Sequence, residues 1–212
     1  MIKAVIFDWD GVIADTPMLV YKINLSIGRK FNGKTFSSYD DFRKRIHEWR
    51  DIYQNIDPSN RNIVDKAQDM FRSEMKKSAG KIRLYEGMQK VIVEMSQNYS
   101  LGIASHSPRE AIYFVLRKNK IEKCFKSVVG CNEAKKLKPH PEHLRVCMKA
   151  MGSQPNETCK IGDAIYDIEA ARAAKLAKVI AVSWGICPVS SLRSADVIID
   201  RPEEIPNAIR AG

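Results

Sequence analysis

Short apolar segments alternate with longer, amphipathic segments along most of the chain. Segments 2–7, 101–104, 127–129, 159–161, 179–183 and 197–199 are mostly apolar and too short for helices, so they predict buried strands. Helix-like stretches lie between them, near 87–97, 108–118, 141–150, 165–175 and 203–210. Strands that alternate with helices in this way predict an α/β fold with a parallel sheet covered on both faces.

One long segment interrupts the alternation. Residues 15–83 contain 15 Lys/Arg and nine Asp/Glu, a net charge of +6, and no convincing buried strand. The pattern predicts a small helical unit inserted after the first strand, with a core made of residues 1–14 and 84–212. Thr16-Pro17 predicts the start of its first helix, with threonine as the N-cap. Ser107-Pro108-Arg109-Glu110 likewise predicts a capping box at the entrance to helix 108–118.

Composition narrows the class of protein. The 212 residues are 44% hydrophobic and 28% charged, which excludes intrinsic disorder as the main state. No apolar run approaches the roughly 18 residues that a membrane-spanning helix needs. The five cysteines form no C-x-x-C pair, which favours a reducing compartment over a disulfide framework or a zinc site. We therefore expect a cytoplasmic globular protein with no membrane association.

The charge balance leaves several kinds of partner open. A formal charge of +10 could reflect nucleic-acid binding, attraction of small phosphorylated substrates or simple solubility. The densest basic cluster lies at residues 43–50, and no basic tail, zinc-finger spacing or aromatic RNA-binding motif accompanies it. Nucleic-acid binding is therefore the less favoured alternative. Four residues of the cluster are candidate contacts for an anionic part of a substrate: Arg43, Arg45, His47 and Arg50.

Two aspartates follow the first predicted strand, in Asp8-Trp9-Asp10-Gly11. Gly11 permits the chain to bend, so that both carboxylates can face one ligand. The pair could hold a hard divalent cation. Alternatively, one carboxylate could attack phosphorus while the other moves protons. The motif alone does not separate these possibilities from a simple acidic turn.

Further polar side chains follow other predicted strands. Asp163 comes directly after segment 159–161 with Asp167 one helical turn later, so both can face the same cation. Ser105 and His106 follow segment 101–104, where a hydroxyl and a backbone N–H at a helix entrance could cradle a phosphoryl group.

Lys138 stands before a proline in the basic segment 135–142 and could neutralise a phosphate, although a solvated basic loop is the simpler interpretation. His140 and His143 lack metal-ligand partners in the sequence and are predicted to lie on the surface. The carboxyl ends of parallel strands meet at one edge of a sheet. We therefore expect both acidic pairs, the Ser105 hydroxyl and Lys138 to meet at that edge.

These motifs resemble those of the haloacid dehalogenase-like hydrolase superfamily, in particular its phosphatases with a helical cap, such as phosphoglycolate phosphatase and the related β-phosphoglucomutase. Residues 7–16 are similar to the first family motif, Ser105 to the second, Lys138-Pro139 to the third and Gly162 through Asp167 to the fourth. The resemblance covers nearly the whole chain. It implies a Rossmann-like parallel sheet core with an inserted small α-helical cap domain at 15–83.

The resemblance also implies a role for each matching residue. Asp8 would be the nucleophile that forms an aspartyl-phosphate, and Asp10 would be the general acid and base. Ser105, His106 and Lys138 would contact the phosphoryl group. Mg²⁺ would be the cofactor, held by the Asp8 carboxylate, the Asp10 backbone carbonyl, Asp163 and, through water, Asp167.

Two departures from the family pattern affect the site. His106 stands where Asn or Gly is usual, and Ala164 stands where Ser is common. Asp10 argues against the dehalogenase branch, which lacks this carboxylate. The predicted activity is therefore that of a phosphoric monoester hydrolase acting on a small phosphorylated metabolite.

Two alternatives stay open at this point. One is a sugar phosphomutase of the same superfamily, which would keep both Asp8 and Asp10. The other is a basic nucleic-acid-binding protein built on this fold. The sequence makes no prediction of oligomeric state.

Overall fold

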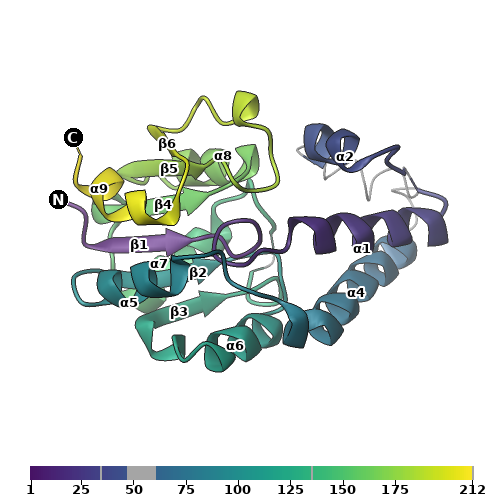
Figure 1. Cartoon of the computed structure of the whole chain (residues 1–212), viewed down its shortest axis with the longest axis horizontal. Helices are drawn as coiled ribbons and strands as arrows, with labels where there is room; N and C mark the ends of the chain where they lie inside the picture. The colour runs from purple at the N-terminus through teal and green to yellow at the C-terminus, as the bar shows by residue number, and fades with distance from the viewer. Residues whose placement is uncertain (34, 47–60, 135, 212) are drawn as a thin grey trace.

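The computed structural model describes residues 1–33, 35–46, 61–134 and 136–211. Its centre is a six-stranded, fully parallel sheet with the strand order β3-β2-β1-β4-β5-β6 (Figure 1). The strands are β1 (Ala4–Phe7), β2 (Ser100–Ala104), β3 (Phe125–Val129), β4 (Thr158–Gly162), β5 (Lys178–Val182) and β6 (Val197–Ile199). The α/β fold with a parallel sheet is confirmed, and each predicted strand is present.

Three of the four interior strands, β1, β4 and β5, are buried along their whole length. A strand with helices packed on both of its faces has no solvated side, so its sequence is nearly continuous in apolar residues and does not alternate. Lys160 in β4 and Lys178 in β5 are exceptions, because both are buried lysines inside these apolar strands.

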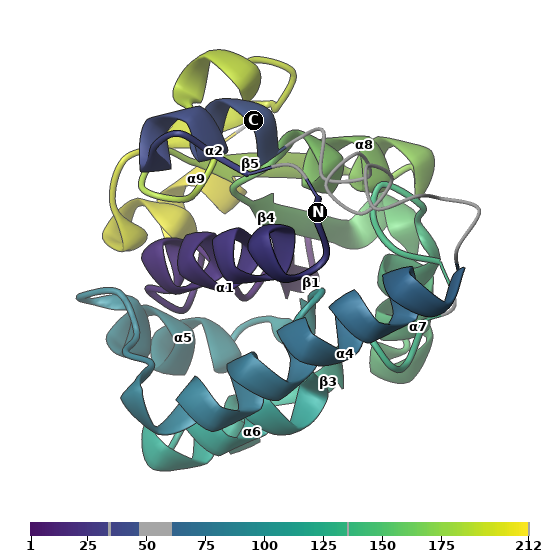
Figure 2. The ribbon, with the colours of Figure 1, turned by 90° about the vertical axis from the view of Figure 1, so that its right-hand side faces the viewer.

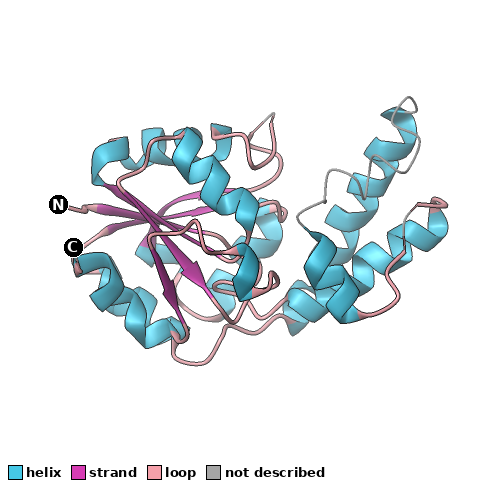
Figure 3. Ribbon diagram, turned by 90° about the horizontal axis from the view of Figure 1, so that it is seen from above, coloured by secondary structure: helices cyan, strands magenta, loops and turns pink. Residues whose placement is uncertain are grey.

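Helices cover both faces of the sheet, as Figure 3 shows from above. Helices α7 (Glu142–Met151) and α8 (Ile165–Ala173) pack on one face. Helices α5 (Met88–Ser96), α6 (Arg109–Lys118) and α9 (Ile205–Arg210) pack on the other. Short 3-10 turns connect several elements, at Ala79–Lys81, Glu122–Cys124, Pro155–Glu157, Val189–Ser191 and Pro202–Glu204.

The inserted segment forms helices beyond the carboxyl ends of the strands. They are α1 (Pro17–Lys30), α2 (Tyr39–Arg45) and α4 (Arg61–Ser78), and α1 packs against both of the others. Figure 2 shows α1 and α4 lying across the end of the sheet. The predicted helical cap is therefore present, and it faces the edge of the sheet where the polar motifs lie.

The two chain segments that join cap and core run side by side. Asp15 N donates to Arg83 O at 2.9 Å and Tyr85 N donates to Ile13 O at 3.1 Å, while Ala14 and Leu84 form an antiparallel bridge. The crossing points thus lie next to the boundaries predicted at 14/15 and 83/84, although the exact division into domains stays a prediction. No helix in the described part of the chain combines the length and apolarity of a membrane span.

Candidate active site

Asp8 and Asp10 stand at the carboxyl end of β1, in a tight turn. Asp8 N donates to Ile161 O of the neighbouring β4 at 2.8 Å, which continues the sheet pairing by one residue. Gly11 follows with a φ of 76°, in the left-handed region that favours glycine. A Cβ at Gly11 would overlap the Asp163 carboxylate. The predicted bend is confirmed, and the glycine lets the two acidic motifs approach each other.

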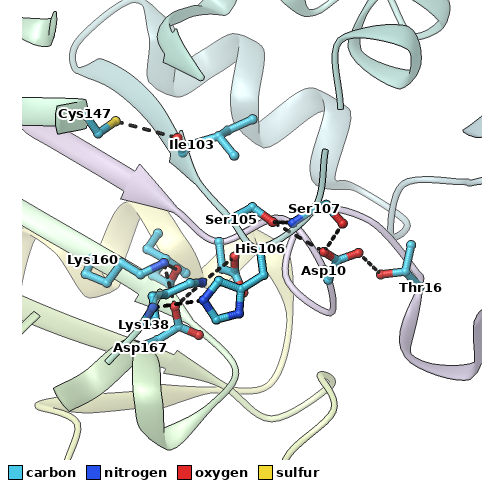
Figure 4. Close-up of polar contacts among 12 residues, drawn as sticks. Asp10, Thr16, Ile103, Ser105, His106, Ser107, Lys138, Cys147, Lys160 and Asp167 are labelled. Carbon is cyan, nitrogen blue, oxygen red and sulfur yellow. Dashed lines mark hydrogen bonds and ion pairs between the residues drawn. The ribbon is translucent and has the colours of Figure 1, made fainter. Parts of the chain in front are cut away.

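The Asp10 carboxylate is held by hydroxyl groups from two distant segments (Figure 4). Thr16 Oγ1 donates to Asp10 Oδ1 at 2.8 Å, and Ser107 Oγ donates to Asp10 Oδ2 at 2.6 Å. The Ser105 hydroxyl, which is buried, lies farther from Asp10 Oδ2, at 3.4 Å. Asp10 is therefore fixed in orientation before any substrate binds.

These contacts correct two predictions about helix caps. Helix α1 begins at Pro17 with Thr16 at the N-cap position, as predicted, but the Thr16 side chain makes no capping hydrogen bond. Helix α6 begins at Arg109, and the Ser107 side chain does not cap it. Each hydroxyl instead donates its proton to the Asp10 carboxylate, and hydrogen bonds to a charged acceptor are strong. The predicted capping box at Ser107 is therefore wrong. Because Thr16 and Ser107 have the sequence pattern of helix caps, sequence reasoning did not identify them as contacts of Asp10.

Lys138 lies between two of the aspartates. Its Nζ is 2.8 Å from Asp8 Oδ1 and 2.9 Å from Asp167 Oδ1, and the residue is only 2% exposed. Lys138 therefore does not lie in a solvated loop. Although burial opposes its charge, Asp167 and Asp8 together raise the pKa of Lys138. The side chain is a fixed cation beside the Asp8 carboxylate.

Three carboxylates converge at this edge of the sheet. One carboxylate oxygen from each of Asp8, Asp163 and Asp167 lies within 4.8 Å of the other two. Asp163 Oδ2 accepts a hydrogen bond from Ile186 N at 2.7 Å, whereas Asp163 Oδ1 and Asp167 Oδ2 have no hydrogen-bond partner although they are buried. Unpartnered buried carboxylate oxygens are costly, and they are the ligands that Mg²⁺ prefers. The donor set therefore fits a divalent cation.

The pKa shifts follow from burial and crowding. Burial, and next the charge of Asp167, raise the pKa of Asp8, while burial and Asp8 raise the pKa of Asp163 well above its ordinary value. Burial also disfavours ionisation of Asp167, but Lys138 and Lys160 outweigh it and lower the pKa of that carboxyl. Burial and Asp8 raise the pKa of Asp10 to about 6. A carboxyl with such a pKa can exchange a proton near neutral pH.

His106 supports the lysine loop. Its Nε2 accepts a hydrogen bond from Lys138 N at 3.0 Å, and its ring stacks on Tyr166 with centroids 5.7 Å apart. Burial, followed by the charge of Lys138, lowers the pKa of His106 well below the ordinary value, so the ring is neutral at pH 7. The predicted contact of His106 with phosphate stays a prediction.

The prediction that His143 lies on the surface is wrong. His143 is 0% exposed, and its ring lies 5.7 Å from that of His106. It stands in the first turn of α7, on the face that the helix turns toward the sheet. His140, by contrast, has a partly exposed side chain.

Lys160 is a further site residue that sequence reasoning missed. Its Nζ lies 3.0 Å from Asp167 Oδ1, and the whole residue is 0% exposed. A signal was available, since a lysine in the middle of an otherwise apolar strand needs a buried partner. That strand precedes the Asp163–Asp167 pair directly, which made Asp167 the natural candidate.

The candidate substrate residues of the basic cluster have other contacts. Arg43 Nε donates to Ile186 O of the core at 2.8 Å. Arg45 lies 3.2 Å from Asp41 and over the ring of Phe36. His47 and Arg50 lie outside the described residues. The structure therefore brings neither described arginine into the cavity at the site.

A small cavity lies between the aspartates and the cap, with a volume of about 30 Å³. The core contributes the charged and polar part of its lining, including Asp8, Asp10 and Lys138. The described cap residues that line it, Val20, Ile46 and Phe71, are all apolar. This volume is enough for only a water molecule or two.

Comparison with known proteins decides the family. A family model described as haloacid dehalogenase-like hydrolase matches residues 5–182. The chain belongs to the haloacid dehalogenase-like hydrolases. The predicted family and the expectation of a hydrolytic enzyme are thereby confirmed.

Two named relatives match the chain over nearly its whole length. A protein named pyrophosphatase PpaX from Bacillus mycoides is 25% identical over 207 residues, 96% of this chain and 95% of that protein. Its namesake from Oceanobacillus iheyensis is 26% identical, with the same coverage of both chains.

Solved structures share the fold. A predicted phosphoglycolate phosphatase from Haemophilus somnus has a TM-score of 0.75 at 19% identity, covering 98% of this chain and 97% of that one. A β-phosphoglucomutase from Clostridium difficile has a TM-score of 0.74 at 22% identity, covering 99% and 98%. The TM-scores show that this hydrolase shares the overall fold of these two proteins.

Proposed function

We propose that this hydrolase is a Mg²⁺-dependent phosphatase that cleaves a small phosphate monoester through an aspartyl-phosphate on Asp8. One observation carries the proposal. The Asp8 carboxylate lies 2.8 Å from a buried lysine, and it lines the same cavity as a second carboxylate, Asp10, which hydroxyl groups hold in place. The first group suits attack on phosphorus and the second suits proton transfer.

The proposed reaction has two steps, and both use Asp8 and Asp10. In the first, an oxygen of Asp8 forms a bond to phosphorus, the bond from phosphorus to the ester oxygen breaks, and Asp10 gives its proton to the leaving oxygen. In the second, Asp10 takes a proton from water while the water oxygen attacks the phosphorus. The bond from phosphorus to the Asp8 oxygen breaks, inorganic phosphate leaves, and the Asp8 carboxylate is regenerated.

Lys138 and Ser105 would hold the phosphoryl oxygens during both steps, as the family resemblance implies. Mg²⁺ would be held by Asp8, Asp163, Asp167 and the backbone carbonyl of Asp10. When bound, the ion neutralises phosphoryl charge that would otherwise repel the Asp8 carboxylate. His106 keeps the Lys138 backbone in position through its ring nitrogen.

The cap lining indicates the kind of substrate. Val20, Ile46 and Phe71 line the cavity opposite its charged residues, and Arg43 and Arg45 of the cap make their contacts elsewhere. These three described side chains would stabilise an apolar leaving group, and they offer neither charge nor hydrogen bond to a second anion. We therefore propose that alkyl or aryl monophosphates are better substrates than pyrophosphate or phosphoglycolate. The cavity is too small for any of them, so the cap must move away from the core to admit substrate.

Turnover of p-nitrophenyl phosphate tests the proposal. Wild type, Asp8→Asn and the exposed control Asp15→Asn would be assayed with Mg²⁺ and with EDTA. We expect activity that EDTA abolishes, and a loss of roughly 10³ or more in Asp8→Asn alone. Mass spectrometry after an acid quench should find phosphate on Asp8. Equal activity of Asp8→Asn and wild type would reject Asp8 as the nucleophile.

A sugar phosphomutase is the second candidate, because Asp10 is present and the fold is shared with a β-phosphoglucomutase. A mutase returns the phosphoryl group to the sugar, so interconversion of sugar phosphates without net phosphate release would favour it. Steeply salt-dependent binding of DNA or RNA without phosphatase activity would favour the nucleic-acid alternative. We also propose a cytoplasmic setting, supported by the five free thiols.

A further inference from the structure

Lys160 occupies an unusual place for a lysine. It stands in the middle of β4, opposite Ile6 of β1 and Val179 of β5, and is 0% exposed. Its Nζ contacts Asp167 Oδ1 at 3.0 Å and Ile161 O at 3.1 Å (Figure 4). Burying an ammonium group in a central strand is expensive unless it is paired.

Lys160 is not needed merely to hold Asp167 in place. Asp167 Oδ1 already accepts a hydrogen bond from Lys138 at 2.9 Å, so two ammonium groups share one oxygen. Lys138 also lines the cavity and contacts Asp8, whereas the described lining of the cavity does not include Lys160. Lys160 can therefore act on the site only through Asp167 and through its charge.

Lys160 changes the net charge of the buried carboxylate cluster. When Asp8, Asp163 and Asp167 are all ionised, as holding a cation requires, they bring three negative charges into a buried volume, and Lys138 returns one positive charge. Without Lys160 the excess would be two negative charges, which is the charge of one divalent cation. With Lys160 the excess falls to one. A positive charge close to a metal site also repels the metal.

We propose that Lys160 is an internal counter-ion of the metal site, which stabilises the folded protein when the divalent cation is absent and weakens the affinity of the site for it. The inference rests on the metal site of the proposed function. It makes Lys160 a positioning and charge-setting residue, not one that touches substrate. The carboxylate oxygens Asp163 Oδ1 and Asp167 Oδ2 stay available to the ion in either case.

Mg²⁺ binding by calorimetry and thermal unfolding, both at one fixed pH, test the proposal. Two variants remove the charge: Lys160→Met, and Lys160→Gln, whose amide can still donate to Asp167. Lys178→Met is the matched control, because Lys178 is also buried in a central strand but donates to Ala211 O, away from the site. The measurement is binding and stability, so it does not depend on turnover.

We expect both Lys160 variants to bind Mg²⁺ at least about tenfold more tightly than wild type does. We also expect a lower Tm than wild type in EDTA and a larger rise in Tm on adding Mg²⁺. The control should lose stability with no change in Mg²⁺ affinity. A variant that folds only in Mg²⁺ would support the proposal in the same way.

Unchanged or weaker Mg²⁺ binding in the folded variants would overturn the inference, as would failure of both variants to fold even in saturating Mg²⁺. If wild type itself binds no Mg²⁺, the proposed function fails. If wild type binds Mg²⁺ and the variants bind it no more tightly, only the role of Lys160 fails.

Discussion

The Ser107 hydroxyl donates a hydrogen bond to Asp10 Oδ2 at 2.6 Å, across 97 positions of sequence. Ser107 follows β2 and Asp10 follows β1, and the two strands are neighbours in the sheet. Thr16 donates to the other oxygen of the same carboxylate. Both Asp10 carboxylate oxygens are therefore already oriented without any contact from a substrate.

Removing the Ser107 hydroxyl tests the value of this orientation. We expect Ser107→Ala to lower kcat by about tenfold to a hundredfold, since a hydrogen bond to a charged group contributes roughly 1.5–3 kcal/mol. Steady-state kinetics with a monophosphate substrate measure the effect. Ser96→Ala, which removes an exposed hydroxyl bound to Val93 O, serves as the control. A kcat unchanged in Ser107→Ala would show that Asp10 needs no such support.

The pH dependence of stability reports on Asp10 directly. Its folded-state pKa of about 6 lies above the ordinary 3.8, so the folded protein holds this proton more tightly than the unfolded chain. The stability that Asp10 contributes is therefore lost as pH rises from about 4 to about 6, by roughly 3 kcal/mol in all.

Asp10→Asn cannot titrate at this position, so it should escape that loss. The free energy of unfolding of the variant, minus that of wild type, should rise between about pH 4 and pH 6 and stay level above. Urea denaturation in EDTA across this range measures it. A difference that is constant with pH would contradict the raised pKa of Asp10.

Lys138 is predicted to support both stability and catalysis. Lys138→Met leaves Asp8 without its lysine and Asp167 with only Lys160, inside a buried cluster. Loss of one partner of a buried ion pair costs roughly 3–5 kcal/mol. We expect a fall of that order in the free energy of unfolding, together with loss of turnover. Lys136→Met, an exposed neighbour, should match wild type in both measurements.

Arg43 and Arg45 are predicted to differ although they stand two positions apart. Arg43 Nε joins the cap to the core through its hydrogen bond to Ile186 O, and Ile186 also lines the cavity. Arg45 pairs with Asp41 inside the cap. We expect Arg43→Met to lower kcat/KM by up to about tenfold, because one hydrogen bond that holds the cap over the site is lost. Arg45→Met should stay within about twofold. Equal effects of the two substitutions would argue against a role of Arg43 in cap closure.

Local patterns along the chain were enough for the fold and for the meeting of several polar residues at one edge of the sheet. Buried strands are short and continuously apolar, so each could be recognised from a few residues. The aspartates, Ser105 and Lys138 could be placed at one edge, because in a parallel sheet the residue that follows each strand lies there. Segment 15–83 stood out because it lacks the apolar runs of the core.

The tertiary structure alone decided the partners of each polar side chain. Thr16 and Ser107 have the sequence signature of helix caps, yet in the structure both hydroxyls donate to the Asp10 carboxylate. His143 has no motif that marks it as buried, and the packing of α7 on the sheet hides it. A lysine inside an apolar strand is unusual enough to be noticed in the sequence, but the partner of Lys160 is Asp167, in the first turn of the next helix. Hydrophobic burial follows local composition, whereas a hydrogen bond or ion pair depends on the positions of two atoms that the sequence does not relate.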